Sequence, residues 1–184
     1  MYILKMTTTF ETSEVISQII QNNPEINTCV YLLSNKYSTK ELRQGGLCKI
    51  IRKIFQSKDK IKRKGGVELV QRILQLGSKN NKNFNFLLFN LGSELLQLAG
   101  DKKSEEVRQI AKKTIFSLFE SLQVAVMPVF INNFIIGGKN TGLTPLARWQ
   151  TKVLSLKILS KAAELAPREI EAMMATLVPI ISRL

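Results

Sequence analysis

The stretch RWQTKVLSLKILSKAAELAPREIEAMMATLVPIIS, residues 148–182, decides the fold. Its apolar residues recur at spacings of three and four, which is the period of an α-helix and not of a strand. Pro167 divides the stretch, because proline is tolerated only in the first turn of a new helix. The pattern therefore predicts a helix over residues 146–166, a sharp turn, and a second helix over residues 168–184. Two helices joined in this way form a helical hairpin.

The first helix of this hairpin is apolar on two faces. One face carries Trp149, Val153, Leu156 and Ala163, and the other carries Leu154, Ile158 and Leu165. Packing by neighbours on both sides is the implied environment. Trp149 is therefore expected to anchor the core between helical repeats rather than to serve as a ligand platform. The expected structural anchors are Trp149, Val153, Leu156, Pro167 and Pro179.

The rest of the chain has the same helical character. No segment shows sustained alternation of apolar and polar residues with the hairpin turns that an all-β domain needs. Helical periodicity covers residues 39–56, 67–76, 84–99 and 105–122, and breaks fall at residues 22–24, 57–66, 77–83, 100–104 and 137–145. Asp101 and Ser104 are plausible caps for the helix at 105–122, which opens with Glu105 and Glu106. The chain is therefore expected to contain seven to eight helices.

Weak internal repeats accompany these helices. Gly65, Val107 and Trp149 come into register at steps of 42 residues. Two of the columns that follow stay apolar, whereas Lys157 and Ser160 break two others in the third copy. A step near 40 with two helices per unit is the period of HEAT repeats. A proline also recurs within helical patterns, in VMPV at residues 126–129 and in LVPI at residues 177–180.

The predicted fold is all-α, an α-α superhelix of the HEAT or armadillo type built from antiparallel helix pairs. A single domain over residues 1–184 is expected, with approximate repeats at 36–64, 65–104, 105–144 and 145–184 after a helical lead-in at 1–35.

Composition narrows the function. The 184 residues are 45% apolar and 22% charged, which excludes a disordered or membrane-embedded chain. The sequence lacks His entirely, which removes Ser-His-Asp and Cys-His catalysis and His-ligated zinc. Its 27 Lys and Arg against 14 Asp and Glu give a net charge of +13, which favours a polyanionic partner.

Compartment signals point to the cytoplasm. Cys29 and Cys48 have neither metal-site nor disulfide-scaffold spacing and are expected to be reduced, buried thiols. Residues 1–14 lack the apolar stretch of a signal peptide, and the longest apolar run, residues 124–131, is too short to span a membrane. A membrane partner is therefore not expected.

Nearly all of the charge excess lies between residues 36 and 82, where the net charge is +11. Eight cations on one predicted helix face and the adjoining turn are the predicted contacts with RNA, and we name them the basic ridge: Lys49, Arg52, Lys53, Lys58, Lys60, Lys62, Arg63 and Lys64. Gly65 and Gly66 would allow a close approach of the backbone. No aromatic residues interleave with the cations, so base-specific recognition is not expected. The alternative is that these side chains merely keep the protein in solution.

No residues are assigned to catalysis, a cofactor, a metal or a small-molecule substrate. The segment Gly137-Gly138-Lys139-Asn140-Thr141 departs from a phosphate-binding loop, because Asn133 and Asn140 stand where glycine and a hydroxyl residue are required. Neighbouring carboxylates such as Glu105 and Glu106 lie in first helical turns, where they compensate the helix dipole.

The motif W-Q-x-K at residues 149–152, followed by the L-A-P turn and the L-V-P-x-I helix, resembles a HEAT repeat of fungal-type translation elongation factor 3. It is similar too to the repeats of the ribosome-bound general-control activator of amino-acid starvation signalling. The segments SKDKIKRKGG at residues 57–66 and GDKK at residues 100–103 resemble the preceding repeats, so that the likeness covers roughly residues 36–184.

This resemblance implies an amino-terminal HEAT solenoid that docks on the ribosome in translation elongation and touches ribosomal RNA and ribosomal proteins. In elongation factor 3 two ATP-binding cassettes follow the solenoid. This chain contains no cassette, so we expect a non-catalytic fragment whose apolar end, residues 177–184, binds a continuing repeat. The alternative is a protein-interaction scaffold that resembles importins or phosphatase adaptors, or a part of the general-control activator.

Overall fold

The computed structural model describes residues 40, 42, 46–79, 85–138 and 141–184. These residues form helices and turns without any strand, which confirms the all-α class for this part of the chain. The chain divides into two compact units, Met1–Asn90 and Leu91–Leu184, with the boundary inside α6 (Asn85–Leu98). The predicted lead-in at residues 1–35 and the thiol of Cys29 lie outside the described residues.

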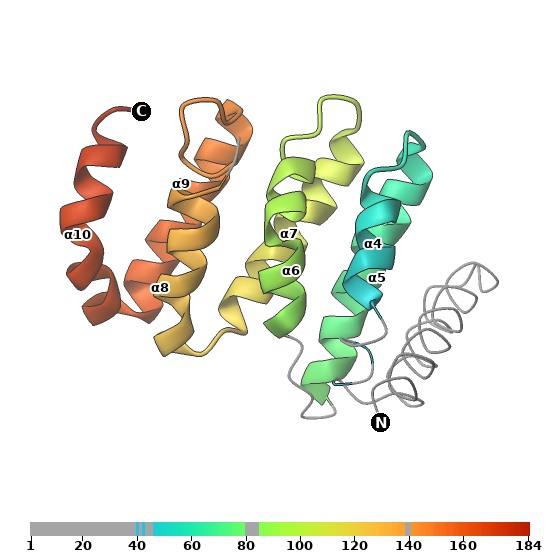
Figure 1. Cartoon of the computed structure of the whole chain (residues 1–184), viewed down its shortest axis with the longest axis horizontal. Helices are drawn as coiled ribbons and strands as arrows, with labels where there is room; N and C mark the ends of the chain where they lie inside the picture. Colours follow the sequence, from blue (N-terminus) through green and yellow to red (C-terminus); the bar gives the residue numbers. More distant parts are fainter. Residues whose placement is uncertain (1–39, 41, 43–45, 80–84, 139–140) are drawn as a thin grey trace, which may run out of the picture. The chain divides into compact units, whose positions relative to one another are not determined.

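In the first unit, α4 (Leu47–Phe55) and α5 (Lys60–Lys79) pack against each other and run in opposite directions (Figure 1). The helix predicted over residues 39–56 is interrupted, since Gly46 has a φ of 74° directly before α4. Such a positive φ is left-handed backbone that glycine adopts without strain. Lys40 and Leu42 are helical as well.

The break predicted at residues 57–66 is wrong from Lys60 onward, because α5 begins there. Asp59 caps this helix: its Oδ1 accepts a hydrogen bond from the Ile61 N–H at 2.8 Å, and its carbonyl accepts one from the Arg63 N–H at 3.1 Å. Gly66 does not open the backbone to a ligand. A Cβ there would lie 2.7 Å from Cγ2 of Ile54, so Gly66 allows α5 to approach α4 closely.

Alanine substitutions at two adjacent glycines of α5 should change the stability of the protein in opposite directions. Gly65→Ala meets no heavy atom within 4 Å, and it should raise the free energy of unfolding by about 0.5–1 kcal/mol because it removes unfolded-state entropy. Gly66→Ala forces Ile54 and Phe55 aside and should lower that free energy by about 1–3 kcal/mol. Urea titrations followed by circular dichroism measure both changes, and equal signs would contradict this account of the packing.

The second unit contains the rest of α6 and α7 (Glu105–Glu120), which begins as predicted. Ser104 is its N-cap, and the side-chain oxygen accepts a hydrogen bond from the Val107 N–H at 3.4 Å. Acidic residues in the first turn suit the positive end of the helix dipole. The buried residues of α7 are Val107, Ala111, Thr114, Ile115, Leu118 and Phe119.

After α7 the chain forms a 3₁₀ turn (Val124–Val126), α8 (Met127–Phe130) and a π-helix (Ile131–Ile136). The proline predicted to lie inside a helix at residues 126–129 instead occupies the first turn of α8. Proline is tolerated there because that position needs no amide donor. Among the described residues no single helix is long and apolar enough to cross a membrane; α7 and Val124–Ile136 pass that test only as a pair bent by 117°.

The predicted hairpin is present as α9 (Trp149–Leu165) and α10 (Pro167–Ile181), which run in opposite directions (Figure 1). Pro167 opens α10 and Pro179 lies inside it, as expected, and both side chains are exposed. Besides α9, α10 contacts α8. At the end of the chain Leu177 is buried, while Val178, Ile181 and Leu184 are exposed.

Trp149 does not lie where the sequence placed it. Its side chain is 69% exposed and that of Val153 43% exposed, while Leu156 is half-buried. The core is built on the opposite face of α9, through Thr151, Leu154, Ser155, Ile158, Leu159 and Ala162. Both faces of α9 are apolar, but the described residues cover only one of them. The expected anchors Trp149 and Val153 are therefore surface residues in this structure.

Candidate nucleic-acid interface

The last two turns of α4 present cations on the side opposite its core. Lys49 and Lys53 are exposed, at helical spacing from each other, while Leu47 and Ile51 are buried on the other side. Arg52 is half-buried, and its Nη2 donates a hydrogen bond to the carbonyl oxygen of Asn90 at 2.5 Å. That bond orients the guanidinium along the protein surface.

The turn and the first turns of α5 add further cations. Lys58, Lys60 and Lys62 are exposed, and Lys64 is half-buried. The first turn of α5 contains no acidic residue. Asp59, which caps this helix, supplies the only carboxylate in residues 57–64 of the sequence, so the cations around it repel one another and raise the electrostatic energy of the folded chain. A bound anion would relieve that repulsion.

Arg63 differs from the other members of the basic ridge. Its side chain points inward and the residue is only 6% exposed. Nη1 donates hydrogen bonds to the carbonyl oxygens of Ser57 at 2.9 Å and Lys58 at 3.0 Å. These bonds close the turn between α4 and α5, so the structure gives Arg63 a structural position in place of the predicted contact with RNA.

Arg63→Ala should therefore lower stability. Two backbone carbonyls lose a charged donor, and the expected loss in the free energy of unfolding is about 2–3 kcal/mol. Lys62→Ala, at the exposed neighbouring position, should change that free energy by less than about 0.5 kcal/mol. Thermal and urea unfolding compare the two variants, and an Arg63→Ala protein as stable as the parent would show that these bonds contribute little.

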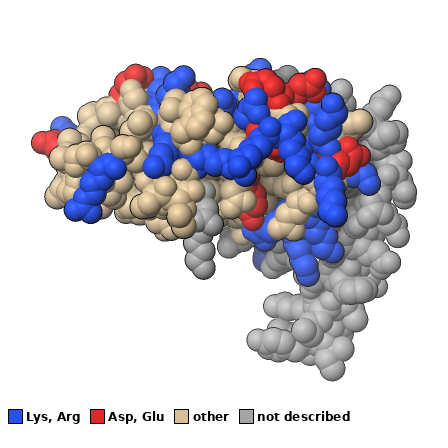
Figure 2. All heavy atoms as spheres, turned by 90° about the horizontal axis from the view of Figure 1, so that it is seen from above, with Lys and Arg blue, Asp and Glu red and all other residues tan. Residues whose placement is uncertain are grey.

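The cations are barely offset by acids. Residues 46–79 contain ten Lys and Arg against two acidic residues, Asp59 and Glu68. Asp59 is committed to the cap of α5. Figure 2 looks onto the helix ends where the turn between α4 and α5 lies and shows Lys and Arg side chains gathered there. This surface can bind phosphate groups through point charges.

A protein-family model, the EF3 N-terminal HEAT repeat, matches residues 28–184. The chain belongs to this family. No curated protein matches the sequence. Membership confirms the HEAT fold class, which antiparallel pairs such as α9 and α10 fit. The repeat boundaries at 36–64, 65–104, 105–144 and 145–184 stay predictions.

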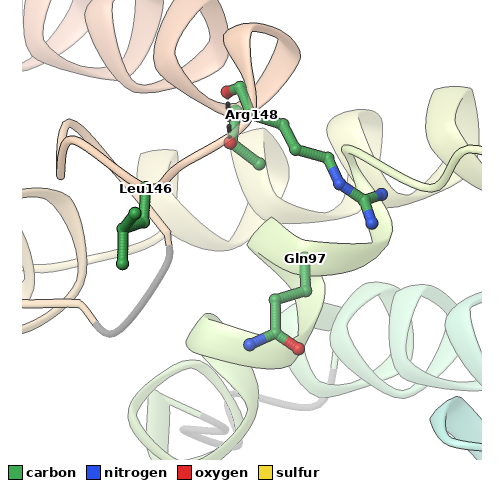
Figure 3. A pocket seen from close by; sticks show the side chains of 4 residues that line it. Gln97, Leu146 and Arg148 are labelled. Atoms are coloured by element: carbon green, nitrogen blue, oxygen red, sulfur yellow. Dashed lines mark hydrogen bonds between the residues drawn. The ribbon is translucent and has the colours of Figure 1, made fainter.

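Outside the basic ridge, this EF3-type HEAT chain has a second surface feature that the sequence reasoning missed. A hollow of about 500 Å³ in the second unit is lined by Gln97, Leu146, Arg148 and Thr151 (Figure 3). Leu146 is 80% exposed and lies close in sequence to Trp149. Whether an apolar side chain is exposed depends on which other segments cover it. The periodicity of the sequence therefore did not indicate this hollow. In the described ranges, no group of three or more Cys, Asp or Glu could hold a metal ion.

Proposed function

We propose that this HEAT module binds the ribosome in the cytoplasm and acts in translation elongation, with the exposed cations of the basic ridge on the phosphates of ribosomal RNA. Ribosomal proteins are proposed as further contacts. The module carries out no reaction in this proposal.

The observation that carries the proposal is the excess of exposed lysines over acids at the start of α5. Lys58, Lys60 and Lys62 are exposed there, the first turn holds no acid, and Asp59 is used as a cap. Phosphates that approach these lysines release condensed counterions, which drives binding without reading sequence. The exposed neighbour Ile61 is aliphatic and offers no ring for base stacking. Contact through the RNA backbone is therefore the expected mode.

Cosedimentation of the full 184-residue chain with ribosomes over a salt series tests the proposal. We expect pelleting at low salt and a linear fall of the logarithm of the binding constant with the logarithm of the salt concentration. Absence of pelleting at low salt, or binding indifferent to salt, would count against it. Binding of an acidic protein client that survives moderate salt, without ribosome pelleting, would favour the scaffold alternative.

A further inference from the structure

We propose that the exposed face of α9 is a docking surface for an acidic amphipathic helix of a partner protein. This inference does not rest on the proposed function, because the basic ridge belongs to the first unit and α9 to the second.

The apolar part of this surface is a row along α9. Trp149 and Val153 are one helical turn apart and are 69% and 43% exposed, and Leu146 precedes them at 80% exposed. Single exposed apolar residues are ordinary, but an exposed Trp one helical turn from an exposed Val, with an exposed Leu in the turn just before the helix, is typical of an interaction site. Trp is also the side chain that most often dominates the energy of a protein interface. The row thus supplies an apolar centre for docking.

Positive charge borders the row. By helical spacing Lys152 and Lys157 lie on opposite sides of the line from Trp149 to Val153. The sequence contains no Asp or Glu from residue 121 to residue 163. No described residue forms an ion pair with either lysine. An apolar row between lysines is complementary to a helix with apolar residues on one face and acids beside them.

Three carboxylates of the neighbouring segments each have another partner. Asp101 Oδ1 accepts a hydrogen bond from the Lys103 N–H at 2.7 Å, and Glu105 forms an ion pair with Arg108. At the far end of α9, Glu164 pairs with Lys161 at 2.9 Å. The charges carried by the first turns of α9 itself, Lys152 and Lys157 with no acid before Glu164, are positive and favour an acidic partner.

The hollow at the start of α9, lined in part by Leu146 and Arg148, adds a recess for a partner side chain. Figure 3 shows the side chain of Arg148 extending toward the end of α6, away from Leu146. Its Nη1 donates to the carbonyl oxygen of Gly100, which holds the guanidinium in place. No side chain caps the first turn of α9. A carboxylate of the partner would find the remaining guanidinium N–H groups and the first-turn amides there.

A protein partner fits this surface better than RNA. Single-stranded RNA is held by aromatic rings on which successive bases stack. The row has one ring, that of Trp149, and its other members, Leu146 and Val153, are aliphatic. Aliphatic side chains instead interdigitate with those of a docked helix at positions i, i+3 and i+4.

Trp149 is the only tryptophan of the chain, so its fluorescence reports on this surface directly. The probe is a synthetic helical peptide of about 20 residues with Leu along one face and Glu on its flanks. We expect a saturable blue shift of the emission as Trp149 leaves water. A matched peptide with Lys in place of Glu should give no shift at the same concentrations.

Substitutions on α9 test whether the acidic peptide binds at this surface. Lys152→Glu with Lys157→Glu should weaken the acidic peptide about tenfold, since two favourable charge contacts become repulsive. The control Lys113→Glu with Arg168→Glu makes the same change in net charge on α7 and α10 and should alter affinity less than twofold. Trp149→Ala, followed by the anisotropy of a labelled peptide, should weaken binding more than tenfold. Circular dichroism verifies that each variant is folded.

Three results would overturn the inference. The first is no shift with the acidic peptide, and the second is equal binding of the basic peptide, which would mean nonspecific apolar contact. The third is quenching of Trp149 by polyuridylic acid that is abolished by the Lys152→Glu and Lys157→Glu pair, with no response to the acidic peptide. That outcome would assign the surface to single-stranded RNA.

Discussion

Reversal of four exposed cations of the basic ridge, Lys49, Lys53, Lys60 and Lys62, to Glu is expected to lower ribosome affinity roughly a thousandfold. Each lysine that contacts a phosphate contributes about one unit to the salt slope, so the slope should fall by about three to four units. Affinity falls further because four acids then repel the phosphates. The measurement is cosedimentation at several salt concentrations, which gives both the affinity and the slope.

The matched control changes the same formal charge elsewhere. Lys102, Lys103, Lys113 and Arg168 are exposed cations of the second unit, and their reversal to Glu also takes the net charge from +13 to +5. This control should lose affinity only through the weaker long-range field, by about tenfold or less. If both variants bind equally weakly, net charge and not the basic ridge drives binding.

The variant with the four reversed lysines of the basic ridge is expected to fold. Lys60 and Lys62 open α5, and acids at these positions suit the helix dipole. Lys53 lies in the last turn of α4, where an acid opposes the dipole. The two effects offset each other, so we expect the variant to unfold close to the temperature of the parent chain. A lower unfolding temperature would require the binding loss to be reinterpreted as a folding defect.

Phe130→Ala is expected to lower the free energy of unfolding by about 3–5 kcal/mol, the cost of an aromatic side chain deleted from a core. Phe130 is completely buried. Its ring centroid lies 5.5 Å from that of Phe119 and 5.1 Å from that of Phe134. Gly92 on α6 closes the cluster, since a Cβ there would already lie 3.4 Å from the ring of Phe130. Little room remains for the neighbours to fill the cavity.

The neighbouring Val129→Ala is the control for this substitution. Val129 lies in the same short helix but is 49% exposed, so it should change the free energy of unfolding by less than about 1 kcal/mol. Urea unfolding followed by circular dichroism gives both values. A loss below about 1 kcal/mol for Phe130→Ala would mean that the three rings are not a unit of the core.

Much of the fold was predictable, because local rules act over neighbouring residues. Ser104 ahead of two glutamates marked the start of α7, and Pro167 marked the turn between α9 and α10. Predicted helix boundaries were wrong where a residue type is found both in turns and within helices. Gly65 and Gly66 were interpreted as a break, yet α5 runs through them, since Asp59 caps the helix earlier and Gly66 is needed for contact with α4.

The candidate interface was predictable in composition and only partly in detail. Charge is a property of the sequence, so the excess of cations around α4 and the start of α5 needed no coordinates. Which cations face solvent did require them. Arg63 turns inward because the carbonyl oxygens of Ser57 and Lys58 converge on it once the turn has formed. No pattern in the sequence distinguishes it from Lys62.

Helix α9 shows most clearly which features follow from the local sequence and which depend on the tertiary structure. Its apolar period, its end at Pro167 and its net positive charge follow from residues close together in the chain and are independent of the rest of the molecule. Which of its two apolar faces is buried was settled by its neighbours. Leu154 and Ile158 are covered, while Trp149 and Val153 face solvent. Burial is a property of contacts between distant segments, so the surface of Trp149 became visible only in the folded chain.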